Sequence, residues 1–167
     1  DDDTPEAGGA TELAAAPMTP NYASPEQIAR QPIGTASDVY ALGVLLFELL
    51  AGLRPYRLTR DTRGALEQAI LDTEPTRPSR AALTDELAAQ RGAHLASLRR
   101  QLRGDLDTII LKALKKRPAD RYASVAALEE DLQRWLNNEP VRAHPDGWGY
   151  RLGKLARRHA LPLGAAT

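Results

Sequence analysis

The stretch "TASDVYALGVLLFELLAG", residues 35–52, decides the fold of this 167-residue chain. Thr35 or Ser37 can cap the start of a helix, and Asp38 favours the positive end of the helix dipole. Gly52 marks the stop of that helix. Apolar side chains occupy nearly every face between these signals, as in a helix buried inside a protein. A membrane span needs about 18 or more uncharged residues, whereas the apolar run within this stretch is shorter and the stretch contains Asp38 and Glu48. We therefore expect a core helix that is buried on all sides.

The rest of the chain also favours helices. We predict a short helix over 24–30, a short amphipathic helix over 64–73, and longer amphipathic helices over 104–116 and 124–138. The alanine-rich segment 81–103 is expected to be partly helical and peripheral. No stretch alternates apolar and polar residues as a half-buried strand does. The sequence therefore predicts an all-α fold.

Composition excludes several kinds of site. The chain has no cysteine, which excludes disulfides, thiolate metal sites and thiol catalysis. Its three histidines lie far apart and lack metal-ligand spacing, so we predict no metal site. The net charge is zero, although residues 1–29 contain no Lys or Arg and no acid follows Asp146. No basic face suits nucleic acid, and we expect no nucleic-acid partner.

The chain divides into three predicted parts. Residues 1–17 are acidic and rich in small residues, without apolar periodicity, as in a disordered loop. Residues 18–138 form the helical body, and residues 139–167 begin as a linker punctuated by prolines and glycines. The sequence starts with Asp and stops within an apolar run, so we expect an internal piece of a longer protein.

Three blocks together resemble part of a known family. They are "MTPNYASPEQ" (18–27), "DVYALGVLLFELLAGLRPY" (38–56) and "LDTIILKALKKRPADRYAS" (106–124). In this order they resemble the second half of the C-terminal lobe of a protein kinase, most closely the bacterial serine/threonine kinases. Each block alone is weak, but the ordered set is specific. The resemblance implies the helical C-terminal lobe of the kinase fold, with the N-terminal lobe and the catalytic loop missing.

The resemblance also implies an ion pair. Ser24-Pro25-Glu26 matches the triplet that ends the activation segment in this family. The family's glutamate pairs with an arginine before the last core helix, and Arg121 occupies that place. A guanidinium can bind a carboxylate through two hydrogen bonds and so hold a loop in place. The alternative is two solvated surface charges, worth less than about 1 kcal/mol as a pair.

Further roles follow from the same resemblance. Thr19, with Pro20 and Tyr22, matches the loop that reads the substrate in serine/threonine kinases, although Met18 replaces the family's usual glycine. Thr19 therefore implies protein substrates phosphorylated on Ser or Thr. Asp38 matches the aspartate that anchors the catalytic loop; the alternative is a plain acid in the first turn of a helix.

The acidic segment 1–17 matches an activation-loop remnant in this comparison. Thr4 and Thr11 lie where activation loops are phosphorylated, and phosphate could order such a loop by pairing with arginines. The alternative is that both are solvated threonines without a regulatory role.

The resemblance places the catalytic residues outside this chain. No glycine-rich loop, "HRD" or "DFG" motif occurs, and phosphoryl transfer requires such groups. We expect the intact parent to use ATP and Mg²⁺ to phosphorylate protein substrates. The fragment is expected to need the missing N-terminal lobe, to bind no cofactor and to be inactive alone. The alternative is a non-catalytic helical binding or scaffold module, either a pseudokinase or a decayed remnant.

The C-terminal tail, residues 139–167, has a distinct order of aromatic, basic and apolar residues. Trp148 and Tyr150 precede the bases Arg151, Lys154, Arg157 and Arg158, and an apolar run begins after Arg158. This order is typical of a juxtamembrane segment on the cytoplasmic side. We therefore expect a cytoplasmic protein that contacts the inner face of the inner membrane; a solvated basic tail is the alternative.

Overall fold

A computed structural model describes residues 20–58 and 60–144 of the chain. Every regular element in these two ranges is helical, which confirms the predicted all-α fold. The elements are η1 (Pro20–Tyr22), α1 (Pro25–Ile28), α2 (Thr35–Ala51), α3 (Arg63–Asp72), η2 (Pro78–Arg80), α4 (Asp85–Ala89), α5 (Leu95–Leu102), α6 (Asp105–Ala113), η3 (Pro118–Asp120) and α7 (Val125–Leu136).

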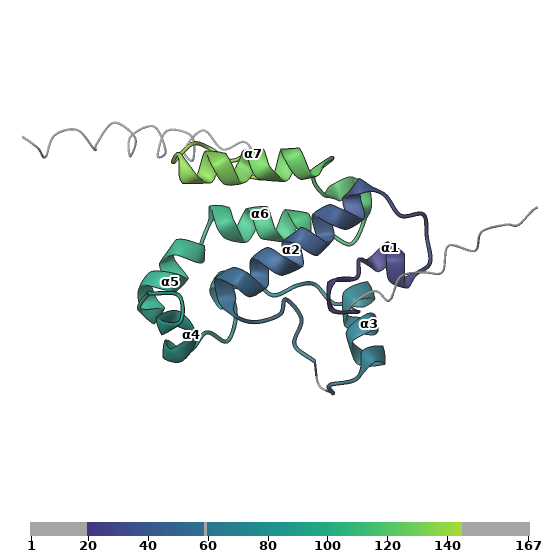
Figure 1. The fold of residues 1–167 in the computed structure, drawn as a ribbon, viewed down its shortest axis with the longest axis horizontal. Helices are drawn as coiled ribbons and strands as arrows, with labels where there is room; N and C mark the ends of the chain where they lie inside the picture. The colour runs from purple at the N-terminus through teal and green to yellow at the C-terminus, as the bar shows by residue number, and fades with distance from the viewer. Residues whose placement is uncertain (1–19, 59, 145–167) are drawn as a thin grey trace, which may run out of the picture.

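Helix α2 crosses the middle of the molecule (Figure 1). Helices α6 and α7 pack on one side of it, α4 and α5 lie towards one end, and α1 and α3 lie towards the other. The N-cap of α2 is Gly34, so neither Thr35 nor Ser37 serves as the predicted cap.

Burial of α2 differs from the prediction. Val39, Tyr40 and Phe47 are completely buried, but Leu45 and Leu49 are 40% and 62% exposed. The expectation of burial on all sides is therefore wrong for one face of α2 within the described structure. Apolar periodicity predicts that a face needs covering, but it does not say whether the covering segment belongs to the same chain.

Gly43 lets α2 and α6 approach closely. A Cβ atom added at Gly43 would lie 2.9 Å from the Cβ of Ala113 and 3.1 Å from a methyl group of Leu114. Such distances are shorter than normal carbon–carbon contacts, so a larger residue would push the helices apart.

The segment 81–103 contributes to the core instead of being peripheral. It forms α4 and α5, and Ala88, Leu98 and Leu102 are buried in the main hydrophobic cluster. Arg91 from the loop between these helices donates hydrogen bonds to the carbonyls of Glu48 and Leu49. The Leu49 carbonyl lies in the last turn of α2, where carbonyls lack intrahelical partners, whereas the Glu48 carbonyl also accepts the Gly52 N–H.

Candidate functional site

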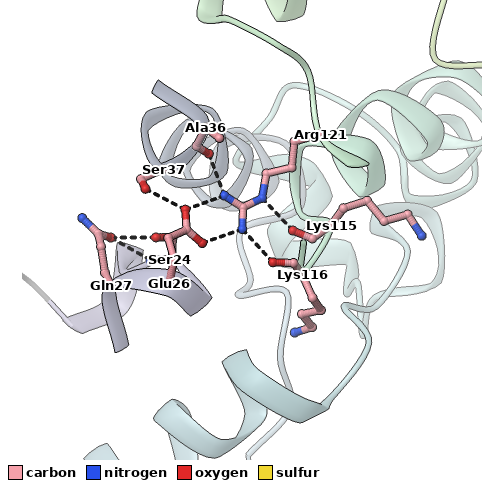
Figure 2. Close-up of polar contacts among 8 residues, drawn as sticks. All are labelled: Ser24, Glu26, Gln27, Ala36, Ser37, Lys115, Lys116 and Arg121. Carbon is pink, nitrogen blue, oxygen red and sulfur yellow. Dashed lines mark hydrogen bonds and ion pairs between the residues drawn. The ribbon is translucent and has the colours of Figure 1, made fainter. Parts of the chain in front are cut away.

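The short helix α1 positions the first residue of the site. Pro25 occupies its first turn, where a missing N–H carries no penalty. The side-chain oxygen of Gln27 accepts the backbone N–H of Ser24 at 2.8 Å, which fixes the turn leading into the helix. The Glu26 carboxylate is thereby held against the start of α2 (Figure 2).

Arg121 meets this carboxylate from the loop between α6 and α7. Its Nη1 and Nη2 atoms each lie 2.7 Å from a different oxygen of Glu26. The guanidinium also donates to three backbone carbonyls, at Ala36, Lys115 and Lys116 (Figure 2). A guanidinium has five N–H donors, so all of them are used.

The ion pair is removed from solvent. The side chains of Arg121 and Glu26 are 0% and 3% exposed. The geometry therefore matches a buried ion pair and not two solvated surface charges. Removing one partner of a buried pair typically costs about 3–5 kcal/mol of stability.

The electrostatics of Glu26 follow from its partners. Burial alone would raise the pKa of Glu26, but hydrogen bonds from Arg121 and from Ser37 outweigh it and lower that pKa to about 2. The Ser37 hydroxyl lies 2.6 Å from the carboxylate. Glu26 is therefore ionised at neutral pH and accepts bonds from both partners.

A second polar chain extends from Arg121 to α3. The guanidinium lies 5.0 Å from the ring centre of Tyr40, whose hydroxyl is 2.7 Å from that of Tyr56. The Lys116 ammonium donates to the Tyr56 hydroxyl and to the carbonyls of Ala69 and Ile70 near the end of α3. Burial is the main cause that lowers the pKa of Lys116 to about 8.

The turn η1 is attached to the C-terminal half of α2. The Tyr22 hydroxyl donates to Glu48 at 2.7 Å, and this hydrogen bond is the main cause that raises the pKa of Tyr22. Arg54 donates to Glu48 and to the side-chain oxygen of Asn21. The predicted substrate-reading loop is therefore fixed at its C-terminal end.

Asp38 has a different environment from Glu26. Its carboxylate is exposed, and within residues 20–58 and 60–144 no hydrogen bond or ion pair reaches it. It borders an open pocket of about 590 Å³ whose other lining residues are Tyr22, Ala41, Leu42 and Leu45. A single carboxylate beside an apolar surface can anchor a chain segment that brings its own backbone donors.

The other predicted site residues are placed only in part. Thr4, Thr11 and Thr19 lie outside the described residues, and Pro20 is the first residue of η1. The sequence did not predict Glu48 as the partner of Tyr22. The feature that could have indicated it is that Glu48 is an acid inside an otherwise apolar helix.

Residues 20–58 and 60–144 contain neither a metal-ligand cluster nor a membrane-spanning helix. No group of three or more His, Cys, Asp or Glu residues there could hold a metal ion. None of the helices between residues 20 and 144 is both long enough and apolar enough to cross a bilayer.

In the described residues, an all-α body holds a buried glutamate with an arginine from the loop before α7, as the resemblance to the C-terminal lobe of a protein kinase implies. The chain matches the protein kinase domain family over residues 6–133 and belongs to it. It is 35% identical over 133 residues to the serine/threonine-protein kinase PknB of Mycobacterium tuberculosis, covering 80% of this chain and 18% of that protein.

Other relatives give the same class. PknB of Mycobacterium leprae is 32% identical over 133 residues, covering 80% of this chain and 18% of that protein. The serine/threonine-protein kinase PknD of Chlamydia caviae is 29% identical over 122 residues, covering 73% of this chain and 11% of that protein. The chain therefore belongs to a serine/threonine kinase family and spans less than a fifth of the length of these relatives.

Proposed function

We propose that this chain is the substrate-side part of a serine/threonine protein kinase that transfers the γ-phosphate of ATP to Ser or Thr hydroxyls of proteins. The observation that carries the proposal is the clamp of Arg121 on Glu26, with five hydrogen bonds from one buried guanidinium. It fixes the end of the segment that precedes α2. A fixed segment can hold a substrate hydroxyl in one orientation. Phosphoryl transfer depends largely on such positioning of the reacting groups.

Specific roles follow from this proposal. Thr19, Pro20 and Tyr22 contact the substrate region, and the bond from Tyr22 to Glu48 supports such a role by fixing the loop. Asp38 anchors the catalytic loop, which would cover the pocket beside Leu45. Thr4 and Thr11 are phosphorylation sites of the activation loop.

The proposal assigns ATP and Mg²⁺ to the intact kinase, since members of the family generally use both. The 167-residue chain alone lacks the glycine-rich loop and the "HRD" and "DFG" motifs. We therefore propose that it is inactive alone and requires the N-terminal lobe. The exposed Leu45 and Leu49 support this requirement, because an unpartnered apolar face favours association with a missing part.

The location is also a proposal. We place the kinase in the cytoplasm, with the segment after Arg158 at the inner face of the membrane. Support comes from the basic and aromatic residues of the tail, which lies outside the described residues.

The test is phosphate transfer from labelled ATP by the intact protein, with matched peptides that carry Ser, Thr or Tyr. We expect transfer to Ser and Thr peptides only, and none from the 167-residue chain by itself. An intact protein that folds but transfers no phosphate would refute the catalytic proposal and favour a scaffold module. Transfer by the isolated chain would refute the requirement for the missing lobe.

A further inference from the structure

The chain immediately after α7 is attached to the helical body. We call residues 141–144 the C-terminal strap. Val141 is 3% exposed and packs in a second hydrophobic cluster with Val39, Ile109 and Leu128. The predicted linker therefore contains, in its described part, one core residue, Val141.

A buried carboxylate holds the strap. Asp131 in α7 is completely buried, and its Oδ1 accepts the backbone N–H of Arg142 at 2.6 Å. Its Oδ2 accepts the N–H of Ala143 at 2.8 Å and the hydroxyl of Tyr122 at 2.9 Å. Hydrogen bonds to a buried charged group are stronger than average, and losing them strands the carboxylate.

Tyr122 is the direct neighbour of Arg121. The backbone at Arg121 is extended, with φ −83° and ψ −173°. Successive side chains of an extended chain point to opposite sides. Arg121 therefore reaches Glu26 on one side of this loop, while Tyr122 reaches Asp131 on the other.

Both side chains are held tightly. The five hydrogen bonds of Arg121 are all 2.7–2.9 Å long. The Tyr122 ring is buried in the same cluster as Val141, with the Lys112 ammonium 4.5 Å from its centre. Hydrogen bonds weaken steeply with misalignment, so a small shift of this loop disturbs the bonds on both sides.

We propose that the C-terminal strap and the Glu26 clamp are coupled through the Arg121–Tyr122 peptide, so that releasing the strap from Asp131 loosens the hold on Glu26. A pull or a partner acting on the chain beyond residue 144 would thereby change how firmly α1 is held. The coupling depends on the described contacts alone and not on phosphoryl transfer.

Hydrogen exchange of individual backbone amides in the intact protein tests the coupling. The reporters are the amides of Arg142 and Ala143 for the strap, and those of Ile28 and Gln31 for α1, which bond to Ser24 and Glu26 carbonyls. Asp131→Asn replaces one acceptor oxygen by a donor. We expect about tenfold faster exchange at the strap amides and about threefold faster exchange at the α1 amides.

Two further variants separate coupling from general instability. In a Tyr122→Phe background, which removes only the hydroxyl, Asp131→Asn should still release the strap but no longer affect α1. Arg142→Ala removes a surface ion pair with Glu130 but keeps the backbone N–H, and it should leave α1 unchanged. Amides in the middle of α2 report global unfolding, and any acceleration there measures the part of the effect at α1 that general instability explains.

A milder variant covers the case in which Asp131→Asn does not fold. Val141→Ala weakens strap packing without stranding a polar group, and it should accelerate the same two sets of amides by smaller factors. The proposal is overturned if either strap variant speeds exchange at the strap while Ile28 and Gln31 keep wild-type rates. An equal effect of Arg142→Ala on α1 would overturn it as well.

Discussion

Replacing Glu26 by alanine should strand the Arg121 guanidinium in a site with no solvent access. The pKa of Glu26 falls from an ordinary 4.5 to about 2 in the folded protein. At about 1.4 kcal/mol per pKa unit, this shift corresponds to about 3 kcal/mol of stability at neutral pH. That value agrees with the cost of about 3–5 kcal/mol for breaking a buried ion pair on one side.

A double-mutant cycle on the intact protein measures the interaction. Glu26→Ala, Arg121→Ala and the double variant are compared by urea unfolding followed by circular dichroism. We expect Arg121→Ala to cost more than Glu26→Ala, because Arg121 also bonds three backbone carbonyls. The double variant should be more stable than the sum of the single effects by about 2–3 kcal/mol. Additive effects below about 1 kcal/mol each would refute the reasoning.

The pH dependence of the unfolding free energy tests the contribution of Glu26 independently. The pKa of Glu26 is lower in the folded state than in the unfolded chain, so its stabilising effect is complete above about pH 4.5. It is lost as the pH falls through about 2. Glu26→Gln removes the titrating group, so the difference in unfolding free energy between wild type and variant should shrink across this window. A constant difference would contradict the assigned pKa.

Three other predictions concern single positions. Gly43→Ala should destabilise by about 1–2 kcal/mol in urea unfolding, because overpacking outweighs the better helix propensity of alanine. Lys116 has its pKa lowered to about 8, so stability should rise between pH 8 and about 10, as the unfolded chain binds more protons there. Gly52→Ala should also destabilise, since Gly52 has φ +72° and an added Cβ would lie 2.5 Å from the Arg91 guanidinium.

The chain offers a matched control variant for each of these three predictions. Gly64→Ala adds a Cβ with no atom within 4 Å and should be neutral or stabilising. Lys115→Met, at an exposed position, should keep the alkaline rise that Lys116→Met abolishes. Gly92→Ala, at φ +63° with nothing within 4 Å, carries only the backbone strain. If Gly52→Ala costs no more than Gly92→Ala, Arg91 adds nothing at that helix end.

The fold could be predicted from the sequence where periodicity and end signals agree. The core helix predicted over residues 35–52 is α2 to within one residue, and the last amphipathic helix is α7. The burial of segment 81–103 is harder to predict, because its buried positions are alanine and leucine spaced among many polar residues. Weak amphipathicity leaves open whether such a segment joins the core.

The site could be predicted only where a motif carried it. The meeting of Glu26 and Arg121 was expected from their places in two blocks, although 95 residues separate them. Nothing in the sequence indicates that Asp131 binds Tyr122 and two backbone amides, since an acid on a helix is most often solvated. Which polar groups face one another inside a core is decided by tertiary packing, and periodicity does not contain that information.

The long separation of the clamp residues has a consequence for synthesis on the ribosome. Glu26 is made 95 residues before Arg121. At about 5–20 residues per second, it waits for about 5–20 seconds before its partner is translated. During that interval α1 can adopt other contacts, and the loop closes only after α6 has been made. Slower translation between the two residues would extend the period in which a nascent chain is open to chaperones or proteases.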